Sequence, residues 1–210
     1  MSEQKRETFV TPKGTAKWIR VNEPDTKYKD EGEYKVSLLL GGKEAEQMKT
    51  KIDAAIKVSV DAAKAANKGK KIKQADAPYR ADVDKEGNET GLTMFNFKAK
   101  ASGVKKKDNK PWTFRPAVFD AKKTPIPVTV AVWSGSEVKV AYQLKPFGES
   151  NYSPTVGAGV SLALQAVQVI KLVTGQGRDA AAFGFGEEEG EAVQAGEAPA
   201  GGQDTTDEEF

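Results

Sequence analysis

The sequence of 210 residues contains neither cysteine nor histidine. These absences exclude disulfide bonds, thiolate zinc sites, cysteine nucleophiles and histidine bases, and with them the Ser-His-Asp triad. A magnesium site made of carboxylates alone is still allowed, but the acidic residues before position 178 are scattered singly. We therefore expect a protein that is not an enzyme and holds no metal and no cofactor.

Long apolar runs are also absent. No stretch reaches the roughly 18 apolar residues that a membrane-spanning helix requires. The first ten residues, MSEQKRETFV, carry charges where a secretory signal would have its apolar centre. We expect a soluble, cytoplasmic protein without a membrane partner.

Positive charge is missing from the last 32 residues, because all 32 Lys and Arg lie at or before Arg178. The first 178 residues carry 20 acids and a net charge of +12, whereas residues 179–210 carry ten acids and a net charge of −10. This segment is rich in Gly and Ala, a composition that cannot bury enough apolar surface to offset the entropy of ordering. We expect one folded domain over 1–183 and a disordered acidic tail over 184–210.

Alternation of apolar and polar residues dominates the basic part of the chain. In EVKVAYQLKPF, the residues Val138, Val140, Tyr142 and Leu144 share one face, and lysines lie on the other. Similar alternation predicts strands over 15–21, 34–40, 93–101, 113–120, 127–133 and 160–173. Phe95 and Phe97 are expected in the core, opposite Lys98 and Lys100.

A single segment, residues 43–67, has apolar residues at helical spacing. Many short strands with one inserted helix predict a mainly β protein, an antiparallel barrel of five or more strands that is closed or partly open. The stretch DVDKEGNETGLT has acids near calcium-loop spacing, but Thr93 stands where the bidentate Glu is required. A hairpin turn explains this stretch better.

Lysines and aromatic residues are interleaved around position 110 and continue onto the predicted strands. Cations track phosphates and aromatic rings stack on bases, so this pattern is typical of a groove for unpaired nucleic acid. The candidate residues are Lys98, Lys100, Lys105, Lys107, Lys110, Trp112, Arg115, Lys139 and Lys145. The alternative is that the lysines only hydrate loops and that Trp112, with Phe114, belongs to the core.

The order of several blocks, from GTAKWIRVNEPD through YKVSLLL, FNFKAKAS, VKVAYQLKPF and VGAGVSLALQAVQVIKLV to an acidic terminus closed by Phe, resembles the single-stranded DNA-binding proteins of short-tailed bacteriophages. The resemblance runs from about Gly14 to Phe210. It implies an OB-fold with a helix inserted between the second and third strands, no cofactor, and a role in coating DNA during phage replication and recombination in the host cytoplasm.

The resemblance also suggests site residues and partners. An aromatic residue follows the proline of the VKVAYQLKPF strand in the family, which makes Phe147 a candidate stacking residue, and Tyr152 stands in for a second aromatic whose equivalent is unclear. The acidic tail is implied to contact the phage DNA polymerase and helicase/primase and to support a homodimer. Its candidate contacts are Asp204, Asp207, Glu208, Glu209 and Phe210.

Three points stay open at this stage. The basic region could instead serve an RNA-binding OB module or a phage structural or assembly protein. Either Trp112 or Phe147 could prove to be a core ring. The lysine-rich segment 68–73 receives no role from the resemblance.

Overall fold

The computed structural model describes residues 7–27, 30–105 and 108–173. The chain divides into two units, Met1–Gln176 and Gly177–Phe210, and every described residue belongs to the first. The predicted domain boundary at 183/184 and the acidic tail lie outside the described residues. Within the described ranges, no helix is both long and apolar enough to cross a membrane.

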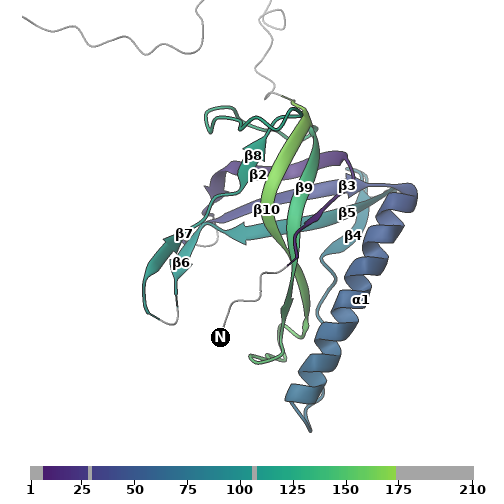
Figure 1. The fold of residues 1–210 in the computed structure, drawn as a ribbon. Helices are drawn as coiled ribbons and strands as arrows, with labels where there is room; N and C mark the ends of the chain where they lie inside the picture. The colour runs from purple at the N-terminus through teal and green to yellow at the C-terminus, as the bar shows by residue number, and fades with distance from the viewer. Residues whose placement is uncertain (1–6, 28–29, 106–107, 174–210) are drawn as a thin grey trace, which may run out of the picture. The chain divides into compact units, whose positions relative to one another are not determined.

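Five long strands form a closed ring in the first unit (Figure 1). They are β2 (Gly14–Asp25), β3 (Glu33–Leu40), β5 (Glu89–Lys100), β10 (Gly159–Lys171) and β9 (Glu137–Phe147). Neighbours in this order are hydrogen-bonded, and β9 also pairs with β2, which closes the ring. A small five-stranded barrel with this order is an OB-fold, so the predicted fold class is confirmed.

The sequence predicted an antiparallel barrel, but one pair of strands in the ring is parallel. Strand β10 runs parallel to β5, whereas β2–β3, β3–β5, β9–β10 and β2–β9 are antiparallel. The reason is geometric, because directions cannot alternate around a ring with an odd number of strands. At least one pair must therefore be parallel.

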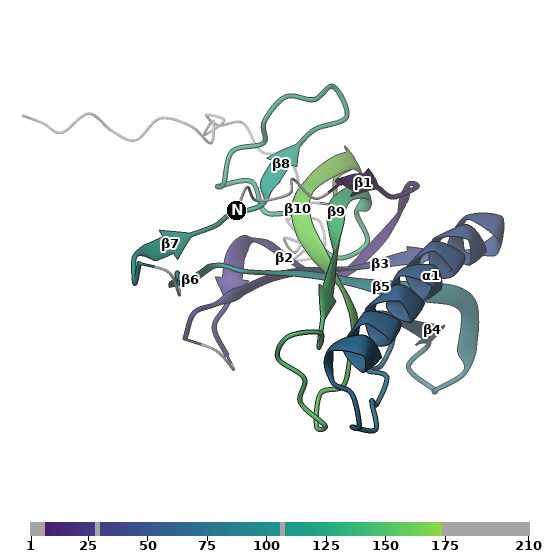
Figure 2. The same ribbon diagram turned by 60° about the horizontal axis from the view of Figure 1, so that its bottom comes forward.

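Shorter strands extend the barrel. They are β1 (Phe9–Val10) beside β9, β4 (Tyr79–Val83) beside β5, β8 (Ala117–Phe119) parallel to β10, and the hairpin of β6 (Ser102–Val104) with β7 (Pro111–Thr113). In Figures 1 and 2 this hairpin projects from the barrel on the side away from the helix. The single strand predicted over 113–120 is divided between β7 and β8, with Pro116, which lacks a backbone N–H, in between.

The strand predicted over 127–133 does not form. Its backbone groups bond instead to one side chain of β2: the Asn22 amide donates to the carbonyls of Val128 and Val130, and its oxygen accepts the N–H of Val132. A turn between Pro127 and Val130 accompanies these bonds. The amide therefore satisfies groups that a neighbouring strand would otherwise have to satisfy.

The predicted helix is present as α1 (Gly42–Ala66), inserted between β3 and β4. It packs against β9, β10 and β5 through an apolar stripe that includes Met48, Ile52 and Ile56 (Figure 2). Buried Ser59, on the same stripe, donates hydrogen bonds to the carbonyls of Phe147 and Gly159, at 3.2 and 2.8 Å. The helix thus holds the end of β9, at Phe147, next to the start of β10, at Gly159.

The barrel interior is filled by the residues that alternation had assigned to it. Phe95 and Phe97 are fully buried, with Leu38, Val138, Val140 and Leu162 around them. The stretch considered for calcium is a β4–β5 turn, as predicted: the Asp84 carboxylate accepts the N–H groups of Glu86 and Asn88. These backbone donors, that of Asn88 first, lower the pKa of Asp84.

Candidate nucleic-acid interface

Along each of four strands, the residues that alternate with buried core residues point outward, and together they form a polar outer face. Lys35 of β3 is paired with Lys98 of β5, Lys98 with Ala163 of β10, and Ala163 with Gln143 of β9. The next outward position on β9 is Lys145, paired with Ser161. Successive side chains point to opposite faces of a strand, so this polar row follows directly from the buried one.

A groove of about 640 Å³ lies between this outer face and the β6–β7 hairpin. We call it the lysine groove. Five of the predicted site residues line it, namely Lys98, Lys100, Lys105, Trp112 and Lys145. Its remaining lining includes Phe114, Ser161, Ala163 and Gln165. The structure therefore brings together residues that lie up to 47 positions apart in the sequence.

The charge of the lysine groove is strongly positive, since four lysines and one glutamate, Glu33, line it. One lysine, Lys100, forms an ion pair with Glu31 at 2.5 Å. The side chains of Lys98, Lys105 and Lys145 are exposed and form no ion pair with a described residue. Cations without anionic partners are available to bind an anionic ligand such as a phosphate backbone.

Trp112 is half-buried and packs on a glycine of the neighbouring strand. Gly103 is paired with Trp112 across the hairpin, and a Cβ built on Gly103 would lie 2.9 Å from Cζ2 of the indole. The glycine therefore lets the ring lie flat against the backbone of β6. Phe114, two residues after Trp112, is partly buried and packs against the barrel core.

Phe147 is supported in the same way at the other end of the outer face. It is paired with Gly159, and a Cβ built there would lie 3.3 Å from Cζ of the Phe147 ring. The two Ser59 hydrogen bonds fix the backbone of this pair. Phe147 is partly exposed and lies two residues beyond Lys145, on the same face of β9.

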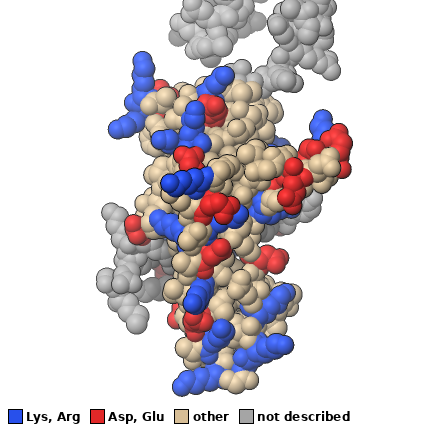
Figure 3. Space-filling view, turned by 90° about the vertical axis from the view of Figure 1, so that its right-hand side faces the viewer, with Lys and Arg blue, Asp and Glu red and all other residues tan. Residues whose placement is uncertain are grey.

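Tyr152 joins the β9–β10 loop to the lysine-rich segment 68–73. Its hydroxyl accepts the N–H of Lys73 at 2.9 Å and donates to the carbonyl of Lys71 at 3.1 Å. The lysines of this segment, Lys68, Lys70, Lys71 and Lys73, are exposed. Figure 3 shows Lys and Arg gathered at this lower end, where α1 finishes. The Tyr152 hydroxyl thus positions a basic loop, and it does so independently of any contact that the Tyr152 ring makes.

Other predicted site residues lie apart from the lysine groove. Lys110 is exposed in the hairpin loop. The Arg115 guanidinium donates to the carbonyl of Asn22 at 2.6 Å and anchors the chain beyond the hairpin to β2. Lys139 lines a separate apolar hollow with Val10 and Phe119. Lys107 and the tail residues Asp204, Asp207, Glu208, Glu209 and Phe210 lie outside the described residues.

Sequence reasoning missed Trp18, which strict alternation in β2 places on the same face as buried Ala16. The indole is 52% exposed, because an irregularity in the β2–β3 pairing between Lys17 and Arg20 reverses the alternation. Two cations lie near the ring, Lys17 Nζ at 5.1 Å and Arg80 Cζ at 5.9 Å from its centroid. Exposed Trp133 lines the same hollow as Trp18.

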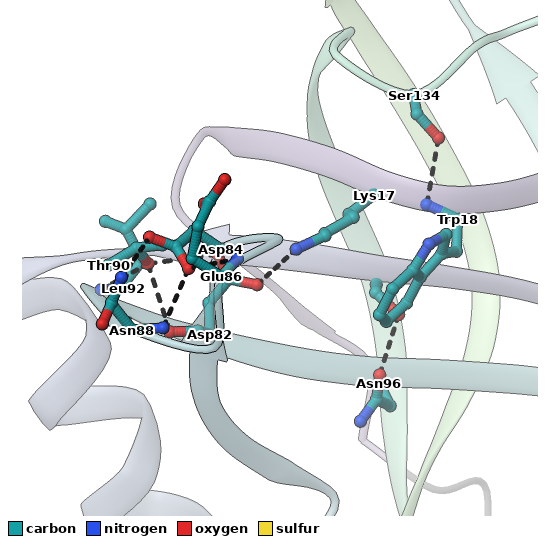
Figure 4. A network of polar contacts seen from close by, with 11 residues as sticks. Lys17, Trp18, Asp82, Asp84, Glu86, Asn88, Thr90, Leu92, Asn96 and Ser134 are labelled. Carbon is teal, nitrogen blue, oxygen red and sulfur yellow. Dashed lines mark hydrogen bonds and ion pairs between the residues drawn. The ribbon is translucent and has the colours of Figure 1, made fainter.

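A polar network lies beside Trp18 (Figure 4). Lys17 Nζ donates to Asp82 Oδ1 at 2.6 Å, and Thr90 Oγ1 donates to Asp82 Oδ2 at 3.1 Å. Asp82 is buried, and its hydrogen bond to Lys17 is the largest of the effects that lower its pKa. Among the described residues, no group of His, Cys, Asp or Glu side chains is arranged to hold a metal ion.

A closed five-stranded barrel with a basic groove and supported, partly exposed aromatic rings has the features of a nucleic-acid-binding OB-fold. The chain is matched over residues 13–172 by the family described as "Single-stranded DNA-binding protein, Bacteriophage T7". It belongs to that family.

Individual relatives agree with this assignment. The single-stranded DNA-binding protein of Enterobacteria phage T3 is 29% identical over 195 residues, covering 83% of this chain and 81% of the relative. The crystal structure of gp2.5, a single-stranded DNA-binding protein of bacteriophage T7, aligns with a TM-score of 0.66 and 27% identity, over 90% of this chain and all of that one. A protein of bacteriophage Enc34, solved in complex with single-stranded DNA, shares the fold at 16% identity, with a TM-score of 0.57 over 81% of this chain and 89% of that one.

The Lys17–Asp82 pair predicts a pH-dependent stability. Lys17 holds the pKa of Asp82 below the value of about 3.9 expected in the unfolded chain, so the pair stabilises the fold above that pH and this stabilisation is lost as pH falls through the folded-state pKa. We expect Lys17→Gln to lower the free energy of unfolding by about 1–3 kcal/mol at pH 7, because a buried carboxylate loses its partner. The difference from the native protein should shrink in urea titrations below pH 4.

The matched control is Lys85→Gln, which removes a nearby exposed lysine that has no ion pair with a described residue. It should leave the free energy of unfolding nearly unchanged both at pH 7 and below pH 4. A Lys17→Gln loss that persists undiminished at pH 3 would show that packing of the lysine stem, not the ion pair, is responsible.

Proposed function

We propose that this protein binds single-stranded DNA without sequence preference and coats it during phage DNA replication and recombination in the host cytoplasm. The observation that carries the proposal is the lysine groove, in which Lys98, Lys105 and Lys145 lack ion-pair partners among the described residues and lie beside Trp112. In single-stranded DNA the faces of the bases are free to stack on aromatic rings, and the phosphates beside them can contact lysines. In a duplex the base faces are hidden. The names of the family and of its phage relatives support the same function.

The role is binding and not catalysis. The described lining of the lysine groove consists of lysines, one glutamate and neutral side chains, and it includes no pair of carboxylates that could act as acid and base. We infer that the phosphate backbone lies along the row from Lys98 to Lys145, with bases turned toward Trp112 at one end and Phe147 at the other. The basic 68–73 segment beside Tyr152 extends this path beyond Phe147.

Binding should weaken strongly with salt, because each neutralised phosphate releases condensed counterions. The slope of log affinity against log salt is about −0.7 per phosphate contact on single strands, so a handful of contacts predicts roughly −3 to −4. Lys98→Gln and Lys145→Gln should each make the slope shallower by about 0.7, measured by fluorescence titration with oligo-dT. Lys49→Gln is the control, since Lys49 lies on α1 and is paired with Glu46.

The same titration with duplex DNA and with RNA separates the other functions. Weaker binding to both is expected. Tighter binding to RNA would identify an RNA-binding module instead, and an affinity for single strands that does not change with salt would remove the lysine groove from the binding site.

The two supported rings should contribute by stacking. We expect Trp112→Ala and Phe147→Ala each to cost about 1–3 kcal/mol of binding free energy while circular dichroism shows an intact fold. Tyr152→Phe should separate the two roles of that residue, since it keeps the ring but removes both hydrogen bonds to the 68–73 segment. A ring whose removal unfolds the protein belongs to the core, and one whose removal changes nothing is not part of the site.

We further propose that the acidic tail competes with DNA for the lysine groove and recruits the phage polymerase and helicase/primase, and that the protein acts as a homodimer. Residues 179–210 carry ten acids and no Lys or Arg, against a net +12 in the rest of the chain. On this proposal the tail behaves as a flexible chain, and about two dozen such residues reach on the order of 25–30 Å.

Deleting residues 190–210 should raise affinity for oligo-dT most at low salt, where the competition is least screened, and should abolish contact with the polymerase or helicase. Phe210→Ala is the matched variant, expected to keep the competition but lose the partner. If the truncated protein binds DNA no more tightly and still recruits both enzymes in pull-down assays, the tail only aids solubility and its terminal Phe has no role.

A further inference from the structure

Trp18 has a backbone conformation that tryptophan rarely adopts. Its φ is +51°, in the left-handed region that favours glycine, within the irregular pairing between Lys17 and Arg20 of β2. A bulky residue in this conformation is strained, and such strain is found mainly at functional positions. The strain is not compensated by burial of the ring, because the indole remains 52% exposed.

The surrounding structure holds this conformation in place. The Trp18 N–H donates to Ser134 Oγ at 3.0 Å, and the neighbouring Ala16 exchanges backbone hydrogen bonds of 2.8 Å with Gly135 and Ser136. The turn that precedes β9 therefore fixes the irregular part of β2. Figure 4 shows the indole extending from β2 away from this serine.

Trp18 lines two hollows of the surface. One hollow, of about 620 Å³, lies between Trp18 and Trp133, and a second, of about 570 Å³, lies between Trp18 and Arg80. Lys17 and Arg80 are within 6 Å of the ring centroid, at 5.1 and 5.9 Å. The hollow shared with Trp133, which neither Lys17 nor Arg80 lines, gives a planar ring of another molecule room to reach the indole.

The ring lies over the same outer face that forms the lysine groove. Lys35 lines the Trp18 hollow, and it is paired across the sheet with Lys98, which lines the lysine groove. Met94 lines the second hollow, and it lies on the face of β5 that also carries Lys98 and Lys100. The strands that carry Trp18 and Lys98, β2 and β5, are two strand spacings apart in the sheet, about 10 Å.

The two hollows differ from the lysine groove in charge. The first is lined by Arg20 and Lys35 with Glu23 and Asp25, and the ion pair of Lys35 with Asp25 neutralises half of these charges. The second is lined by three cations, among them Lys17 paired with Asp82, and by three acids. A ligand bound here gains little from charge, so what Trp18 offers is its aromatic face.

We propose that Trp18 is a second stacking position for an unpaired base of the DNA strand held in the lysine groove, and that its contribution to affinity does not depend on salt. This inference rests on the proposed single-strand binding. The strand leaves the lysine groove past Lys98 and Lys35, and the next base stacks on the indole. Stacking on a neutral surface releases few counterions, so the binding it adds is the same at low and high salt.

The decisive variant is Trp18→Gly, because glycine adopts a φ of +51° without strain. Its melting temperature should equal or exceed that of the native protein, while its affinity for oligo-dT should fall about five- to hundredfold, the equivalent of one lost stacking contact. The loss should be the same factor at every salt concentration, leaving the log–log slope unchanged. Trp18→Phe should restore most of the affinity, because it restores an aromatic face.

Two comparisons make the test specific. In the same titration Lys98→Gln should change the slope, which Trp18→Gly should not. In the double variant Trp112→Phe/Trp133→Phe, Trp18 is the sole tryptophan of the three in the chain, and bound oligo-dT should quench its emission. Unchanged emission in a complex that does form would overturn the proposal.

The outcomes also separate this inference from the proposed function. If the Lys98 and Phe147 variants lose affinity but Trp18→Gly does not, single-strand binding stands and the Trp18 position fails. If none of them loses affinity, the function itself is wrong. If Trp18→Gly leaves affinity intact but changes the sedimentation coefficient, Trp18 belongs to a contact between protein chains and the proposal is overturned.

Discussion

Closure of the ring through β9 is the constraint on which the rest of the structure depends. β9 pairs with β10 along its length and with β2 over the short stretch Gly14–Thr15. That stretch of β2 also touches β3 closely, since a Cβ on Gly14 would lie 2.5 Å from the carbonyl oxygen of Leu39. Glycine is therefore required where β2 passes between its two neighbours. Once the ring is closed, every strand has an inner and an outer face, and core and site are made by alternate residues of the same strands.

The helix adds a second constraint by fixing one end of the outer face. Ser59 is buried, and its two hydrogen bonds reach the backbones of Phe147 and Gly159 on adjacent strands. The same glycine supports the Phe147 ring, as Gly103 supports Trp112 at the hairpin. Each ring therefore packs across a neighbouring strand at a residue that has no side chain, which positions the ring without burying it completely.

Much of the fold could be predicted because it follows from regular alternation and one helical stripe. In most of the long strands and in α1, apolar residues recur at the spacing of a strand or of a helix. The prediction failed where a side chain replaces a strand as hydrogen-bond partner, as Asn22 does for residues 128–132. It also failed at Trp18, because an irregularity between two residues of β2 reverses the alternation and leaves no mark in composition.

The site was predictable in kind but not in arrangement. Interleaved lysines and aromatic residues indicated a nucleic-acid groove, and five of those residues do share one. Arg115 and Lys139 carry the same charge, yet they lie elsewhere, because the Arg115 guanidinium is bonded to the carbonyl of Asn22 and because β9 is long enough for its two ends to face different surroundings. Local sequence contains the chemistry of such a site, whereas the pairing of distant strands decides which residues meet.

Among the described residues, the hairpin that forms one wall of the lysine groove has three residue pairs, and it joins the barrel where the N–H of Phe114 donates to the carbonyl of Ala101. A chain as long as a genome offers few free ends, so a channel that had to be threaded would fill slowly. A groove on the outer face of the barrel can instead be entered from the side at any point along the polymer.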